Sequence, residues 1–325
     1  MKVLLTHRPG GAYGYISESW SNTLKYAGIE VSRWDGKPNS WDAFQPDLYI
    51  GCSGHQQPIP TNRGNTKIAI HCNPYGPVDM GPINEPAGSL AWIIKQKPDA
   101  VFGYGHENNR NFWKYYESKG IAQWVPMATA GDPTIYKVNQ QAQRTEEIVY
   151  LGGYWAYKGQ HLNKYLMPLL TDKNIKSTVY GWGDWPTGIS KGILPETIGA
   201  DKDFYNTGLV APCICEPHTS EYGIDVPERV FKAALCGCYT IHEHIPGFSE
   251  QFMSSTIIAD SVSTYHDAVR EAIANRRFID THAALQRQQV LEKDTYFHRL
   301  SGLFKALGFT KESQLLLNKV EDFKA

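Results

Sequence analysis

The sequence predicts an α/β protein built from two Rossmann-like domains that face each other across a cleft. Short apolar segments alternate with segments of helical periodicity, and this alternation runs through two consecutive series of about equal size. Strands separated by helices are typical of parallel βαβ units. A chain of 325 residues is also long enough for two domains with their own cores.

The first series occupies residues 1–140 and is expected to form the N-terminal domain. Its predicted strands cover residues 2–6, 30–33, 47–52, 67–71, 99–104 and 123–127. Helical patterns occur near residues 17–27 and from about residue 108 to 119. The segment 128–146 is polar with few apolar residues, which indicates an exposed linker between the domains.

The second series predicts a C-terminal domain over residues 147–290. Its strands are expected at residues 147–153, 176–180, 209–215, 238–243 and 256–259, with helices at 159–170, 202–206 and 227–236. The tail from residue 262 onward is mostly helical in pattern, and residues 291–325 form a closing helical segment.

The composition excludes several classes of protein. A formal net charge of −1 argues against a dominant electrostatic partner such as bare duplex DNA or an anionic membrane. A local basic groove from Arg110, Lys114 and Lys119 is left open. No apolar stretch is long enough to cross a membrane, and the first residues turn polar too soon for a signal peptide, so a cytoplasmic protein is expected.

The six cysteines mostly lie in or beside apolar strands, as reduced cysteines of intracellular proteins do. Their two C-x-C pairs have narrower spacing than zinc sites favour, so no metal is expected there. The run Asp201-Lys202-Asp203 matches a D-x-D metal motif, but it follows no hydrophobic strand and is typical of a helix N-terminus. No cofactor is predicted.

Residues 210–243 are the most informative stretch, because they predict a strand, a polar loop, a helix and a second strand. The loop contains Glu216, His218, Glu221 and Gly223. Asp225 is a suitable N-cap for the helix, and Pro227 lies where a missing N–H costs little. Free amides and the positive end of the helix dipole then form a site for an anion such as phosphate.

Glycines after two other strands indicate close approach of the backbone to a ligand. Gly152 and Gly153 end one strand, and Lys158 follows as a cation suited to a diphosphate. Tyr180 and Trp182 flank a glycine at the end of the next strand, in a loop that can stack on a planar base.

Gly10 and Gly11 follow the first strand of the chain. They are equally consistent with a contact to the ligand and with a tight turn between a strand and a helix. Gly10, Gly11 and Gly14 do not have the spacing of a dinucleotide fingerprint, so a dinucleotide site lacks support.

Three histidines follow strands of the first series: His55, His71 and His106. Because carboxyl ends of parallel strands meet at one edge of a sheet, they are expected to share one rim. Histidine there can position a hydroxyl or accept its proton. The residues after His106 do not complete a zinc-binding H-E-x-x-H motif.

With these motifs assembled, residues 147–300 resemble glycosyltransferases of the GT-B fold, in particular the glycosyl transferases group 1 family and its CgeB-like branch. The matching segments are residues 150–153 with Lys158 and Gly159, residues 180–183, residues 227–241 and residues 246–252. The tail at residues 294–299 also looks like that family's closing helix. The resemblance therefore implies C-terminal helices that cross back onto the first domain.

The resemblance implies a nucleotide-sugar donor, with UDP-sugars favoured, and transfer to an acceptor hydroxyl without a metal and with retention at the anomeric carbon. Lys158 would contact the diphosphate, and His71 matches a histidine that many members place near the donor sugar. Phosphate and sugar would be held by the polar loop and by the helix start at Val226, Pro227, Glu228 and Arg229.

The sequence departs from the family at a paired-glutamate motif that binds the ribose. Lys232 and Ile224 occupy the two positions, and Glu228 or Glu221 is left as the substitute. Other readings stay open: an epimerase or phosphorylase of the same fold, or a non-catalytic sugar- or nucleotide-binding protein. The acceptor (glycan, lipid-linked sugar, protein, small molecule or modified DNA base) and the oligomeric state are not predicted.

Overall fold

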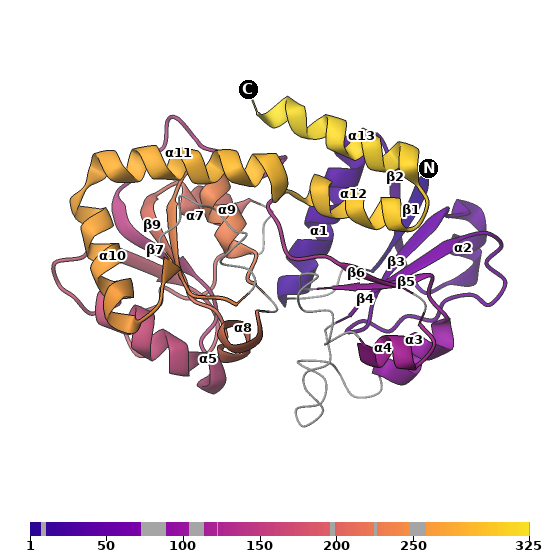
Figure 1. Cartoon of the computed structure of the whole chain (residues 1–325), viewed down its shortest axis with the longest axis horizontal. Helices are drawn as coiled ribbons and strands as arrows, with labels where there is room; N and C mark the ends of the chain where they lie inside the picture. Colours follow the sequence, from indigo (N-terminus) through magenta and orange to yellow (C-terminus); the bar gives the residue numbers. More distant parts are fainter. Residues whose placement is uncertain are drawn as a thin grey trace. The chain divides into compact units, whose positions relative to one another are not determined.

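The computed structural model describes residues 1–7, 11–72, 89–103, 114–121, 123–195, 199–223, 226–246 and 258–324. Contacts between Cα atoms divide the chain into two compact units. Unit 1 contains Met1–Asp132 and Tyr296–Phe323, and unit 2 contains Pro133–Thr295 (Figure 1). Within the described ranges, no helix is both long and apolar enough to cross a bilayer.

Unit 1 is built on a six-stranded parallel sheet, as the alternating sequence predicts. Its strands are β1 (Lys2–Thr6), β2 (Glu30–Trp34), β3 (Leu48–Cys52), β4 (Lys67–His71), β5 (Ala100–Gly103) and β6 (Trp124–Pro126). The order across the sheet is β2-β1-β3-β4-β5-β6. All pairs are parallel, so the carboxyl ends of the strands lie at one edge.

Helices cover both faces of this sheet because its strands alternate apolar side chains to both sides. One face packs against α1 (Gly11–Tyr26), α12 (Tyr296–Ala306) and α13 (Thr310–Val320). The other face packs against α2 (Pro38–Phe44), α3 (Ser89–Gln96) and α4 (Lys114–Ser118). The sequence patterns did not indicate α2 and α3, which are short.

The C-terminal helices belong to unit 1, as the resemblance implied. The amide of Tyr296 donates to the carbonyl of Gly131 at 2.9 Å, and Phe297, Leu300 and Phe304 are buried in the same core as β1 and α1. In Figure 1 the yellow α12 lies beside the indigo α1. The chain thus returns to unit 1 after completing unit 2.

Unit 2 has a five-stranded parallel sheet in the order β11-β10-β9-β7-β8. The strands are β7 (Glu146–Leu151), β8 (Ser177–Tyr180), β9 (Gly208–Cys213), β10 (Tyr239–Glu243) and β11 (Ile258–Ala259). The helical elements are α5 (Ala156–His161), the π-helix η2 (Leu162–Leu166), α6 (Met167–Leu170), α7 (Ala200–Tyr205), α8 (Pro217–Tyr222), α9 (Arg229–Leu235), α10 (Val262–Ala274) and α11 (Arg276–Lys293).

Three expectations about local structure were wrong. Residues 128–132 are buried and not an exposed linker, because they lie against the returning C-terminal helix: Arg299 donates to the carbonyls of Ala128 and Thr129. The polar loop 216–223 contains the helix α8, with Pro217 in its first turn and Gly223 as a left-handed C-cap. Helix α9 begins at Arg229, two residues later than expected.

Candidate active site

The strand order of unit 2 places a ligand-binding position at the carboxyl ends of β7 and β9. From β7 the chain moves to β8 on one side and then to β9 on the other side. The connection that follows β7 therefore runs toward one edge of the sheet, and the connection that follows β9 runs toward the other edge. In open parallel sheets, ligands bind at such a topological switch point.

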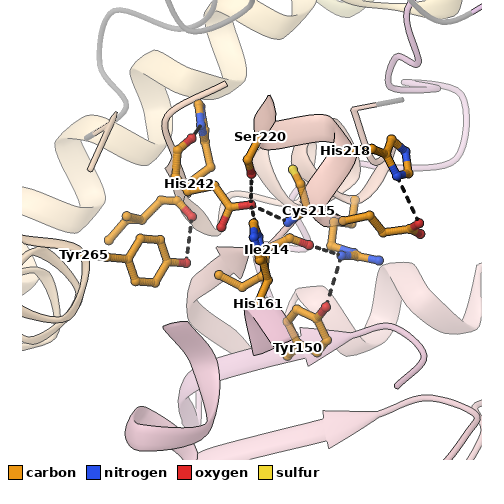
Figure 2. A network of polar contacts seen from close by, with 12 residues as sticks. Tyr150, His161, Ile214, Cys215, His218, Ser220, His242 and Tyr265 are labelled. Atoms are coloured by element: carbon orange, nitrogen blue, oxygen red, sulfur yellow. Dashed lines mark hydrogen bonds and ion pairs between the residues drawn. The ribbon is translucent and has the colours of Figure 1, made fainter. Parts of the chain in front are cut away.

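The guanidinium group of Arg229 lies at this point. Its Nη1 donates to the carbonyl oxygen of Ile214 at 2.9 Å and to the hydroxyl of Tyr150 at 3.2 Å, above the Tyr150 ring (Figure 2). Its Nη2 has no hydrogen-bond partner among the described residues. A Cβ atom on Gly152 would lie 2.9 Å from Nη2, so a glycine is needed after β7 for Arg229 to occupy this position.

Lys158 lies in α5 near the same strand ends. The sequence suggested a mobile surface cation at this position, but Lys158 is buried, with 3% of its surface exposed. Its Nζ lies 5.0 Å from the centre of the Trp155 ring. Burial raises the pKa of the Cys215 thiol well above its usual value, and the charges of Arg229 and Lys158 both oppose this rise. The positive charges of Arg229 and Lys158 are therefore both felt at Cys215, just after β9.

An aromatic surface adjoins the two cations. The rings of Trp155 and Trp182 stack with centroids 5.1 Å apart and planes 2° apart, and Trp182 is 55% exposed. A Cβ atom on Gly153 would lie 2.6 Å from the Trp182 ring, so the glycine allows the two loops to pack closely. Tyr180 does not join this surface, because its ring packs edge-on against Phe204.

Helix α8 carries several residues predicted to bind the donor. His218 is buried, with its ring parallel to that of Tyr157 and its Nδ1 3.7 Å from Glu216 Oε2. The His218 ring thus helps to hold α8 against α5, and Glu216 lies beside it at the start of α8. Glu221 is exposed on the same helix, and Gly223 ends it.

A buried ionic cluster occupies the positions where the family's ribose-binding pair was expected. Lys232 Nζ lies 2.6 Å from Glu228 Oε2, 3.4 Å from Asp201 Oδ2 and 5.0 Å from the centre of the Tyr136 ring. Burial lowers the pKa of Lys232, but the two carboxylates outweigh it and raise that pKa. The Glu228 carboxylate and the D-x-D residue Asp201 are therefore engaged inside the protein, and Pro227 and the buried Val226 come directly before Glu228.

Sequence reasoning missed Glu243, which ends β10. Its Oε1 accepts hydrogen bonds from the amide of Cys215 at 3.0 Å and the hydroxyl of Ser220 at 2.8 Å, and lies 3.4 Å from His161 Nδ1 (Figure 2). A carboxylate at the last position of a predicted strand was the signal available. Within the described ranges, no group of three or more His, Cys, Asp or Glu side chains could hold a metal ion.

Two of the three histidines predicted for the site, His55 and His71, lie among the residues that the structure describes. His71 ends β4 and is 4% exposed, with Tyr13, Trp20 and Phe102 around its ring. Burial lowers the pKa of His71 to about 3. His55 is partly exposed after β3, and Gly11 begins α1. Gly10 and His106 lie outside the described residues.

The depressed pKa of His71 predicts acid lability of unit 1. Between pH 6.5 and 3 the unfolded chain binds a proton at this histidine that the folded chain does not, so folding stability falls as the pH falls. Denaturant unfolding of the wild type and of His71→Gln should show a stability difference that changes by about 2 kcal/mol between pH 7 and pH 5. A difference that stays constant with pH would contradict the buried neutral imidazole.

Comparisons with known proteins agree with this architecture. Residues 164–305 match the family model described as glycosyl transferase-like. No protein with a curated function matches the sequence. Among solved structures, an α-glucosyltransferase in complex with UDP-glucose and DNA containing an abasic site has a TM-score of 0.65 at 10% identity, covering 94% of this chain and 98% of that chain.

Two further structures share the fold. Sucrose-phosphate synthase from Thermosynechococcus elongatus has a TM-score of 0.61 at 11% identity, covering 98% of this chain and 100% of that chain. TarM has a TM-score of 0.58 at 13% identity, and the match covers 84% of this chain but only 57% of TarM.

Two parallel α/β units with helices that return to the first unit define the GT-B fold. The chain has this fold, and its residues 164–305, less than half of the chain, are similar to the glycosyl transferase-like family. Membership of the CgeB-like branch stays a prediction.

Proposed function

We propose that this protein transfers a sugar from a nucleotide-sugar donor, preferably a UDP-sugar, to the hydroxyl group of an acceptor. The observation that carries the proposal is the guanidinium of Arg229 at the carboxyl ends of β7 and β9, together with the buried Lys158 in α5, the helix that follows β7. A diphosphate is the part of such a donor that two fixed cations recognise.

Arg229 would act on the diphosphate through Nη2, since Nη1 is already used by Ile214 and Tyr150. Lys158 would supply a second charge from α5. As the glycosidic bond to the donor phosphate breaks, negative charge builds up on the departing nucleoside diphosphate. Fixed positive groups in a partly buried site stabilise that charge. Two protein cations can fill this role, and this supports the proposal that transfer needs no catalytic metal.

The exposed face of Trp182 is suited to the nucleobase. Base–aromatic stacking contributes about 1–3 kcal/mol per base and tolerates different bases. Among the structural neighbours, the α-glucosyltransferase contains UDP-glucose. Uracil is therefore the base we propose for this protein.

The edge of unit 1 that carries His71 and His55 is proposed to bind the acceptor or the sugar, together with His106. A histidine whose pKa is about 3 is neutral at physiological pH and is a weak base. His71 is therefore better suited to hold a hydroxyl group by a hydrogen bond than to remove its proton. This role is compatible with a retaining transfer, in which the leaving phosphate itself can accept the acceptor's proton.

A panel of nucleoside diphosphates and their sugars in a thermal-shift assay tests the proposal. UDP and UDP-sugars at 100 times Kd should stabilise the protein by about 2.7 kcal/mol. The Lys158→Ala variant should lose most of this shift, while Lys164→Ala in the neighbouring π-helix should keep it.

Binding of no nucleotide in the panel would refute the proposed function. Conversion of a bound donor sugar in the absence of any acceptor would identify an epimerase instead.

A further inference from the structure

One peptide group at the end of β9 lies between two opposite charges. Its carbonyl, from Ile214, accepts from Arg229 Nη1 at 2.9 Å. Its N–H, from Cys215, donates to Glu243 Oε1 at 3.0 Å. In a trans peptide the C=O and N–H point in opposite directions, so the cation and the carboxylate lie on opposite sides of this one peptide.

This arrangement aligns the peptide dipole with both charges. The carbonyl carries the negative end of the dipole and meets the guanidinium, and the N–H carries the positive end and meets the carboxylate. Each contact is a charge-assisted hydrogen bond, which is about twice as strong as a neutral one. Because bonds in such a chain polarise one another, the charge on Glu243 strengthens the bond that holds Arg229.

Glu243 is itself fixed from two helices. Ser220 of α8 donates to Oε1 at 2.8 Å, and His161 of α5 lies 3.4 Å from the same oxygen. The residue is 2% exposed, and among the described residues its Oε2 has no hydrogen-bond partner. A buried carboxylate with an unused oxygen is costly, and hydrophobic packing alone does not require one at a strand end.

We propose that Glu243 is a positioning residue for the donor diphosphate: it holds the Ile214–Cys215 peptide, and through it Arg229, in the orientation that leaves Nη2 available. This inference rests on the proposed function. It assigns Glu243 no contact with substrate. It also makes Ser220 and His161 supporting residues that connect α8 and α5 to the orientation of Arg229.

A double-mutant cycle with UDP, measured by isothermal titration calorimetry, tests this role. Glu243→Gln keeps the shape of the side chain but removes its charge, and Arg229→Met keeps the aliphatic stem but removes the guanidinium. Glu243→Gln should weaken UDP binding about tenfold in the wild-type protein and less than about twofold in the Arg229→Met background. A purely structural role predicts the same loss in both backgrounds, and that result would overturn the proposal.

The matched control is Gln286→Leu. Gln286 is buried and hydrogen-bonds with Thr240 at three atoms, so its loss weakens the same strand β10 away from the switch point. It should lower Tm while leaving the Kd for UDP unchanged. If it weakens UDP binding as much as Glu243→Gln does, the proposal is wrong.

Ser220→Ala provides a second variant in case Glu243→Gln does not fold. It removes the hydroxyl that donates to the Glu243 carboxylate. In the wild-type background this variant should weaken UDP binding about threefold, and in the Arg229→Met background it should have no effect. An equal effect in the Arg229→Met background would count against the proposal. Failure of the wild-type protein to bind UDP or any other nucleotide would refute the proposed function, and this inference with it.

Discussion

Replacing Arg229 with lysine is expected to lower kcat/KM for the donor by about 100-fold or more. Lysine keeps the charge, but it has no planar fork that can donate to Ile214 and Tyr150 from one nitrogen and to a phosphate oxygen from the other. Removing one preorganised donor from a transition-state site typically costs 10²–10³ in rate, that is about 2.7–4 kcal/mol. Initial rates of UDP release at varied donor concentration measure the effect.

The control for this variant is Arg276→Lys. Arg276 lies in α11 and is paired with Asp280 on the exposed surface of the helix. Its replacement should leave kcat/KM within about twofold of the wild type, because exposed pairs contribute little. If Arg229→Lys retains wild-type kcat/KM, then the guanidinium at the switch point does not act on the donor.

Replacing Lys232 with methionine is expected to cost about 3–5 kcal/mol of folding stability. The substitution removes the ammonium group that pairs with the Glu228 and Asp201 carboxylates and leaves both carboxylates buried without it. Breaking a buried ion pair by removing one partner costs this much, whereas replacing the whole cluster is often neutral. Urea unfolding of the wild type and the variant measures the difference.

Two further variants make this prediction specific. Lys176→Met removes an exposed lysine that pairs with Glu146 and should cost less than about 1 kcal/mol. The triple variant Lys232→Met, Glu228→Gln, Asp201→Asn should recover most of the stability lost by Lys232→Met. A loss below 1 kcal/mol for Lys232→Met alone would show that the cluster is not buried as described.

The same cluster has a defined pH dependence. The pKa of Lys232 is raised in the folded protein. Its stabilisation is therefore fully present below the pKa of an unfolded lysine, about 10.4, and is lost as the pH rises further.

The strands of both sheets could be predicted because their signal is local. Short runs of apolar residues between helical segments indicate buried parallel strands, and β4 was predicted with the bounds the structure shows. Helix α8 was missed although Pro217 and Gly223 are suitable start and stop signals, because its six residues are too few for helical periodicity. The buried segment 128–132 was misread because it is covered by α12, which is far away in the sequence.

The candidate site was predicted only in part. Glycines and Lys158 after β7, and Trp182 after β8, could be placed because loops at the carboxyl ends of parallel strands share one edge. The direction of each side chain could not be read in this way. Tyr180 packs on Phe204, Glu216 faces His218, and the buried Lys158 places its Nζ over the Trp155 ring.

The sequence by itself determined the two α/β series, the parallel sheets and the cationic character of the strand ends in unit 2, since hydrophobic period and loop composition act over a few neighbouring residues. Only the tertiary structure decided which charges are paired with one another inside the protein. Asp201, 31 residues before Lys232, joins the local pair of Lys232 and Glu228, and Glu243 reaches the peptide that holds Arg229 from a different strand. The energy of a buried charge depends on partners that folding brings together, and no local pattern records them.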